Sequence, residues 1–98
     1  MMPTGRRQEG VAILQVMKHA TPIALDALET LLAEVRSLGR LTERKRGVFY
    51  TKSKAFLHFH EDPAGFFADV RTGPSWSRLA VNSAKERKAL LATIREWA

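Results

Sequence analysis

Apolar residues recur at helical spacing between positions 22 and 38 of the chain. Leucines and one valine stand three or four residues apart, and charged side chains fall on the opposite side of the same helical projection. Thr21 and Pro22 are typical of a helix start, because threonine accepts a bond from a free amide and proline lacks an amide that would stay unpaired. Gly39 follows as a candidate C-terminal cap. We therefore predict an amphipathic helix over residues 22–38.

The pattern changes to a period of two in the middle of the chain, where aromatic and β-branched residues become frequent. The turn signals are Lys52-Ser53, the Asp-Pro pair within Glu61-Asp62-Pro63-Ala64, and Thr72-Gly73-Pro74-Ser75. The charged segment 40–47 precedes this region and is predicted to be a loop. The alternation between the turns predicts antiparallel strands over residues 48–51, 54–60, 65–71 and 76–81.

The last part of the chain returns to helical spacing. Glu86 stands three positions after Ser83, which is the spacing of a capping box, and an apolar stripe ending at Trp97 follows. Residues 1–10 lack any periodicity and are predicted to be a disordered tail, while the apolar run 11–17 fits a strand and a helical turn equally well. The whole pattern predicts one α+β domain over residues 11–98, with two layers: a helix, an antiparallel sheet of three to four strands, and a helix.

The composition narrows the classes of function. The chain has 98 residues and no cysteine, which excludes disulfides, zinc–thiolate sites and thiol nucleophiles and favours a cytoplasmic protein. Its formal net charge of +6 favours contact with nucleic acid or an acidic partner. The run 11–17 is too short and too polar at its ends for a membrane span, so no membrane contact is expected.

The predicted hairpin separates its side chains onto two faces, because successive strand residues point to opposite sides of a sheet. We pair His60 with Gly65 across a four-residue loop. One face is then entirely apolar and is predicted to be the core face, consisting of Ala55, Leu57, Phe59, Phe66, Ala68 and Val70. The other face, the predicted polar–aromatic face, consists of Lys52, Lys54, Phe56, His58, His60, Phe67, Asp69 and Arg71.

Three interpretations of the polar–aromatic face compete. The first is self-association, since exposed apolar side chains often mark an interface, and it predicts a homodimer. The second is binding of single-stranded nucleic acid, with Phe56 and Phe67 stacking on bases. In that case phosphates would be neutralised by the face's basic residues and by the basic loop Arg44, Lys45 and Arg46.

The third interpretation is a divalent metal site. His58 and His60 stand two apart on one strand, so both imidazoles can meet one ion, with Asp69 or Glu61 as a further ligand. His19 is interpreted as a structural or solvated residue at the end of the first apolar run. Trp76 and Trp97 are expected to seal the edge of the core.

We predict a binding or assembly module rather than an enzyme, with no catalytic residues and no obligatory cofactor. The sequence contains no glycine-rich phosphate loop and no recognisable serine–histidine arrangement. His58 beside Asp69 could serve as an oriented base, but no further catalytic group accompanies them.

The residues between Phe56 and Gly65 carry a resemblance to a known family. They read F-L-H-F-H-E-D-P-A-G, followed by Ala68-Asp69-Val70-Arg71. This segment resembles a family of small bacterial proteins built around the same motif, and the resemblance extends over roughly residues 22–98. It implies a bacterial origin and lends no catalytic residues, because that family has no established activity.

Overall fold

The first helical segment begins as its sequence indicates. In the computed structural model, which describes residues 18–98, the Thr21 hydroxyl accepts a hydrogen bond of 3.3 Å from the Ala24 amide. The segment is divided at Leu28 (φ −96°, ψ 3°) into α3 (Pro22–Ala27) and α4 (Glu29–Ser37). The predicted single helix is thus two consecutive helices. The predicted tail 1–10 and the apolar run 11–17 lie outside the described residues.

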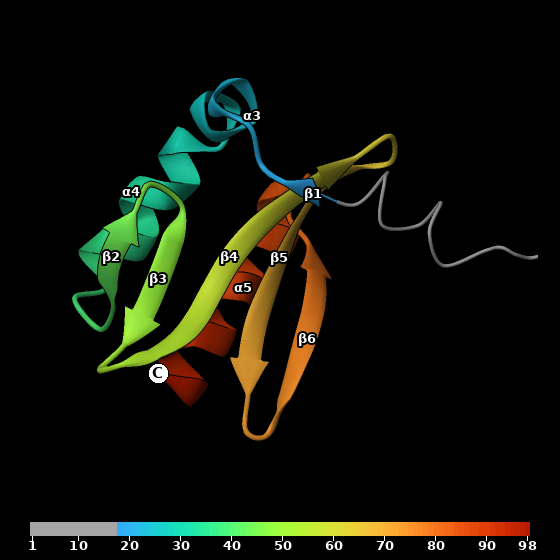
Figure 1. Ribbon diagram of the computed structural model, residues 1–98. Helices are drawn as coiled ribbons and strands as arrows, with labels where there is room; N and C mark the ends of the chain where they lie inside the picture. Colours follow the sequence, from blue (N-terminus) through green and yellow to red (C-terminus); the bar gives the residue numbers. More distant parts are fainter. Residues whose placement is uncertain (1–17) are drawn as a thin grey trace, which may run out of the picture.

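The strands form one antiparallel sheet, and the α+β class is confirmed (Figure 1). Three consecutive hairpin strands, β4 (Lys54–Asp62), β5 (Gly65–Thr72) and β6 (Ser75–Ala80), make up its larger part. The order across the sheet is β2 (Thr42–Lys45), β3 (Val48–Thr51), β4, β5 and β6. The short strand β1 (Lys18–His19) pairs with the far end of β4, beyond the part that pairs with β3 (Val48–Thr51). The sheet of residues 18–98 is therefore larger than the predicted three to four strands.

The segment 40–47 was predicted to be a loop, and this prediction is wrong. Its residues Thr42–Lys45 form the edge strand β2. An edge strand tolerates charged residues, since one of its sides faces no neighbouring strand. Glu43 secures it by accepting bonds from Arg36 (2.6 Å) and from the Gly47 amide (2.9 Å). Gly47 has a φ of 79° and closes the tight turn to β3, a conformation that glycine adopts without strain.

The β4–β5 hairpin is two residues longer than predicted. Asp62 pairs with Gly65, and His60 pairs with Phe67 rather than with Gly65. The turn is shortened to Pro63-Ala64, where the Asp62 carboxylate accepts a bond of 2.7 Å from the Ala64 amide. A shift of two residues keeps every side chain on its predicted face, because strand side chains alternate with a period of two.

A bulge in β4 overturns the predicted position of Phe56. Phe49 pairs with Leu57 and Tyr50 pairs with Ala55, so Phe56 is the extra residue between two pairs. Phe56 is 2% exposed and belongs to the core cluster together with its neighbour Leu57. In the part of β4 that precedes the bulge, each side chain points to the face opposite to the predicted one. Ala55, which pairs with Tyr50, therefore lies on the face predicted for Phe56.

The bulge and the β3–β4 turn remove the two lysines from the predicted polar–aromatic face. Lys54 is one position from Ala55 and therefore takes the opposite parity, at the exposed start of β4. Lys52 lies in the turn between β3 and β4 with a φ of 52°. The two basic side chains stand at one end of the sheet rather than among the histidines.

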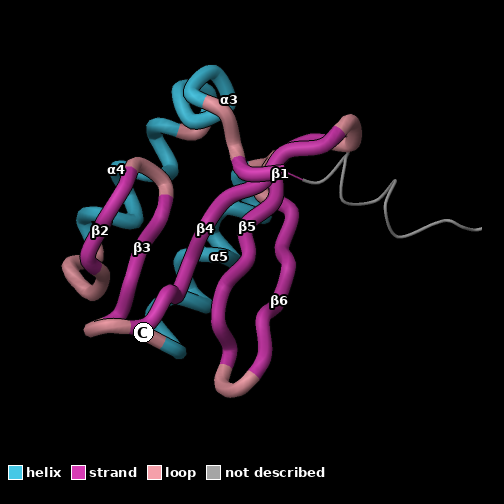
Figure 2. The backbone as a smooth tube through the Cα atoms, viewed as in Figure 1, coloured by secondary structure: helices cyan, strands magenta, loops and turns pink. Residues whose placement is uncertain are grey.

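The helices cover one face of the sheet, where the core forms (Figure 2). The last helix, α5 (Ala84–Trp97), begins with the predicted capping box between Ser83 and Glu86. No helix within residues 18–98 has the length and apolar character needed to cross a membrane. The largest fully buried side chains are Phe49, Phe59, Leu28, Leu31, Leu32, Leu57, Leu90, Ile94, Val35, Val70 and Val81.

The bulge predicts how truncation of two phenylalanines should differ. Phe56→Ala should lower the free energy of unfolding by about 3–5 kcal/mol, because it leaves a cavity in a packed core. Phe67→Ala, at a half-buried position of the neighbouring strand, should cost clearly less. Urea denaturation of both variants checks this. Equal losses, or a larger loss for Phe67→Ala, would contradict the buried position of Phe56.

Candidate metal centre

The side of the sheet opposite the helices carries most of the polar chemistry predicted for it. We call it the helix-free face and define it by the strand parity. Among the predicted residues His58, His60, Phe67, Asp69 and Arg71 lie on it, whereas Phe56, Lys52 and Lys54 do not. Its described members are His19, Thr42, Lys45, Val48, Tyr50, Ala55, His58, His60, Asp62, Gly65, Phe67, Asp69, Arg71, Trp76, Arg78 and Ala80.

All three histidines of the chain meet on this face. His58 and His60 are two apart on β4, and His19 of β1 is the antiparallel partner of His60. The ring centroids are 4.8 Å apart for His58 and His60, 5.1 Å for His19 and His60, and 5.4 Å for His19 and His58. We call these three residues the histidine cluster.

Backbone contacts beside β1 fix the position of His19. The Ala20 amide donates to the Phe59 carbonyl at 3.1 Å, which extends the ladder by one residue. The Thr21 amide donates to the Glu61 carboxylate at 2.6 Å. Glu61 was predicted as a further metal ligand, but it has the opposite parity to His60 and holds the start of α3 instead.

Asp69 adjoins the cluster from β5 and is almost buried, at 9% exposure. Its Oδ2 lies 2.9 Å from Nε2 of His60, and both of its oxygens accept bonds of 2.7 Å from the Arg78 guanidinium. Burial alone would raise the pKa of Asp69, but Arg78 and the neighbouring histidines outweigh it and hold that pKa below its usual value. Asp69 therefore stays a carboxylate next to His60.

His58 lies between the other two histidines and Trp76, whose ring centroid is 5.0 Å away. Burial is the main cause that lowers the pKa of His58 below its usual 6.5, with a further contribution from the charge of His60. His58 is therefore neutral at pH 7, as a metal ligand must be. Within residues 18–98 its Nδ1 is buried and has no hydrogen-bond partner, which is unusual for a buried polar atom.

The histidine cluster can hold a metal ion. One nitrogen from each ring lies within 4.8 Å of the others. Tetrahedral zinc at its usual bond lengths needs ligand nitrogens about 3.3 Å apart, so small side-chain rotations would close the site. The cluster residues are exposed (His19), half-buried (His58) and buried (His60), which leaves the His19 side accessible from solution.

The predicted basic loop does not form a cluster of unpaired cations. Arg46 binds Asp26 at 2.7 Å and Glu29 at 2.8 Å, and the Arg44 guanidinium lies 4.4 Å from the centroid of the Tyr50 ring. Lys45, the third member, makes no ion pair within residues 18–98 and lies at the end of β2.

The sequence interpretation missed three residues in or next to the histidine cluster and Asp69. His19 lies in a two-residue strand without periodicity, and the only signal was that it is the chain's remaining histidine. Trp76, expected to seal the core, is 40% exposed and stacks against the Arg71 guanidinium, which lies 4.4 Å from its centroid. Arg78 is the cross-strand partner of Asp69 and could be found only once the β5–β6 register was known.

Comparisons with protein-family models, with curated proteins and with solved structures found no match to this chain. The resemblance to the bacterial family with the F-L-H-F-H-E-D-P-A-G motif stays a prediction. The geometry of the helix-free face is therefore the basis on which a function can be proposed.

The lowered pKa of His58 predicts a loss of stability in mild acid. As the pH falls below about 6.5, the unfolded chain takes up a proton at this histidine before the folded protein does, so the free energy of unfolding decreases. His58→Gln removes this pH-dependent contribution to the free energy of unfolding. Chemical denaturation at about pH 7.5 and about pH 5.5 should show a larger loss for the wild type than for the variant. A variant that loses as much stability as the wild type would contradict the neutral, desolvated His58.

Proposed function

We propose that this protein binds one divalent transition-metal ion through His19, His58 and His60, with Zn²⁺ as the best match. The observation that carries the proposal is the convergence of every histidine in the chain on one site from two strands that are distant in sequence. A structural role would not require all three to share a place. Three imidazoles with room for a fourth ligand suit zinc, which accepts tetrahedral coordination readily.

The charges around the cluster support a transition metal over calcium or magnesium. Those hard cations prefer several carboxylate or carbonyl oxygens. Within residues 18–98 this face carries two carboxylates: Asp62, which accepts a bond from the Ala64 amide, and Asp69, which is held by both arms of Arg78. Imidazole nitrogen is therefore the donor on offer. Imidazole is a ligand for zinc, copper and nickel.

Asp69 acts in this proposal as a positioning residue for His60. Histidine ligands commonly present their second ring nitrogen to a carboxylate, which fixes the ring and its tautomer. With Nε2 of His60 at 2.9 Å from Asp69, we assign Nδ1 to the metal. Arg78 fixes Asp69 in turn, so the orientation of the ligand is set through two consecutive contacts.

Metal binding should require the three histidines and depend in part on Asp69. Isothermal titration of Zn²⁺ into the metal-free full chain should give one equivalent bound. His19→Ala, His58→Ala and His60→Ala should each weaken binding about tenfold or more, since each removes one of three ligands, and Asp69→Asn should weaken it about 10–100-fold.

Glu34→Gln is the matched control, because Glu34 is an exposed carboxylate on α4, which packs on the opposite face. Circular dichroism of each variant separates loss of a ligand from loss of the fold. Two outcomes would contradict the proposal: wild-type protein that takes up no Zn²⁺, and well-folded histidine variants that bind as tightly as the wild type.

A second candidate function is self-association through the same face. The 40% exposure of Trp76, beside the half-buried Phe67, supports it. These two aromatics would also serve the predicted contact with single-stranded nucleic acid, in which Phe56 can take no part because it is buried. Nucleic-acid binding stays a prediction.

Self-association should be visible in light scattering coupled to size exclusion. We expect a dimer for the wild type and folded monomers for Trp76→Glu and Phe67→Glu, because a buried unpaired charge destabilises an apolar interface. Lys52→Glu, in the exposed β3–β4 turn, is the control for added negative charge. A monomeric wild type would exclude this candidate and leave the metal proposal untouched.

A further inference from the structure

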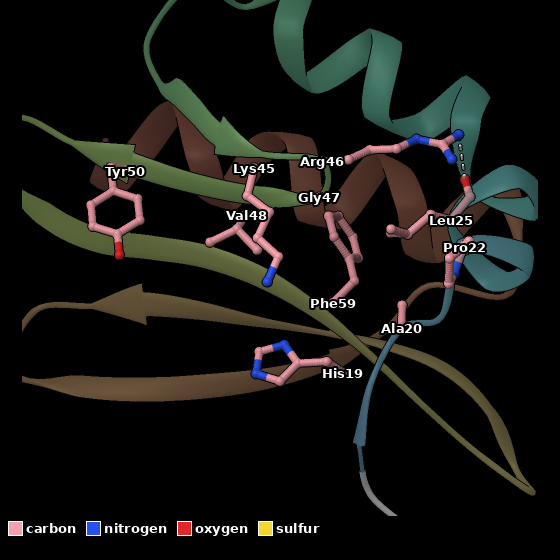
Figure 3. Close-up of a pocket in the computed structure, with 10 residues that line it drawn as sticks. All are labelled: His19, Ala20, Pro22, Leu25, Lys45, Arg46, Gly47, Val48, Tyr50 and Phe59. Carbon is pink, nitrogen blue, oxygen red and sulfur yellow. Dashed lines mark hydrogen bonds between the residues drawn. The ribbon is translucent and has the colours of Figure 1, made fainter.

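A cavity of about 490 Å³ lies beside the histidine cluster, between β1, α3 and the β2–β3 turn (Figure 3). It lies where β4 changes its strand partner. β3 pairs with β4 as far as His58, and the ladder of β1 reaches Phe59 through the Ala20 amide, so the cavity lies between the adjoining ends of β3 and β1. The cavity's lining includes His19 and Val48 from the helix-free face and Leu25 and Phe59 from the helix side. It thus reaches from one side of the sheet to the other.

The lining has an apolar part and a basic part. The wall toward α3 is apolar and is formed by Ala20, Pro22, Leu25 and Phe59. The basic part lies toward the helix-free face and consists of Lys45 and His19. Figure 3 shows Lys45 extending from β2 with its ammonium group directed toward β4 and His19. Among residues 18–98, no aspartate or glutamate lines the cavity.

Of the lysine and the arginine that line the cavity, Lys45 is the one available to bind a ligand. The other cation, Arg46, is engaged with Asp26, Glu29 and the Leu25 carbonyl. Lys45 makes no ion pair in the part of the chain that the structure describes, and it is exposed. An apolar wall with one unpaired cation at its mouth is complementary to a molecule with a hydrocarbon body and one anionic group.

We propose that this cavity binds a small carboxylic acid with an apolar chain or ring, whose carboxylate pairs with Lys45 and whose hydrocarbon part packs against Leu25 and Phe59. The volume falls within the usual range of small-molecule sites, about 300–1,000 Å³. The site is distinct from the proposed metal centre, although His19 borders both. The proposal does not require the metal, so the two can fail separately.

The test is isothermal titration of octanoate into the full chain after removal of metal by a chelator. We expect one equivalent to bind. Octanamide, which has the same chain and no charge, should bind at least about tenfold more weakly than octanoate, because it cannot form the charge-assisted bond with Lys45. Lys45→Gln should weaken octanoate binding about tenfold and still bind one equivalent of Zn²⁺. Lys52→Gln, which makes the same change of charge outside the cavity, should bind octanoate as the wild type does.

A second variant tests the position of the hydrocarbon part. Val48→Phe adds volume to the lining of the cavity on a strand that accepts aromatic residues, and it should reduce octanoate binding about tenfold while circular dichroism stays unchanged. Any of three results would overturn the proposal: no binding of octanoate to the folded wild type, equal binding of octanamide, or full binding by both Lys45→Gln and Val48→Phe. Loss of Zn²⁺ binding alone would count against the metal centre and not against this site.

Discussion

The pairing of β1 with the far end of β4 is the contact on which both candidate sites depend. It consists of two residue pairs. Two hydrogen bonds hold it, one from the Ala20 amide to the Phe59 carbonyl and one from the Thr21 amide to the Glu61 carboxylate. The pairing sets His19 opposite His60 and so completes the histidine cluster. It also sets the end of β1 next to the end of β3, and the cavity lies between these two ends. These two hydrogen bonds, which adjoin the two residue pairs of β1, hold the short strand and allow it to position a functional side chain.

The charges of the helix-free face are arranged so that a histidine stays neutral beside an ionised carboxylate. Arg78 keeps Asp69 charged, and burial keeps His58 neutral. The carboxylate is therefore already compensated, and the imidazoles stay available as metal ligands. A cation bound at the cluster would increase the positive potential next to Lys45, so the metal and an anionic ligand in the cavity should favour each other's binding.

Local patterns were enough to predict where the first and last helices start and which faces the residues of β5 take, but not the division of residues 22–38 into two helices at Leu28. The capping box at Ser83 and the Thr21–Pro22 start depend only on neighbouring residues, and an error of two in the hairpin register leaves parity intact. The position of Phe56 could not be predicted in this way. A bulge is a property of two paired strands, and alternation within one strand contains no sign of it.

The remaining errors have a related cause. Residues 42–45 form a strand without apolar residues because they pair on one side only and are supported by the Arg36–Glu43 contact. His19 joins the other histidines through a long-range pairing that leaves no local signal in the sequence. Arg78 is identified only by its pairing with Asp69 on the neighbouring strand. What sequence patterns missed in the candidate site is therefore what depends on register.

X-ray absorption spectroscopy of the zinc-loaded protein is the sharpest test of the proposed metal site, because it reports the number and type of ligands around the bound ion. We predict three imidazole ligands and one further light atom at about 2.0–2.1 Å, the usual zinc–nitrogen distance. A spectrum with one imidazole or none, or with six oxygen ligands, would contradict a metal site built from His19, His58 and His60.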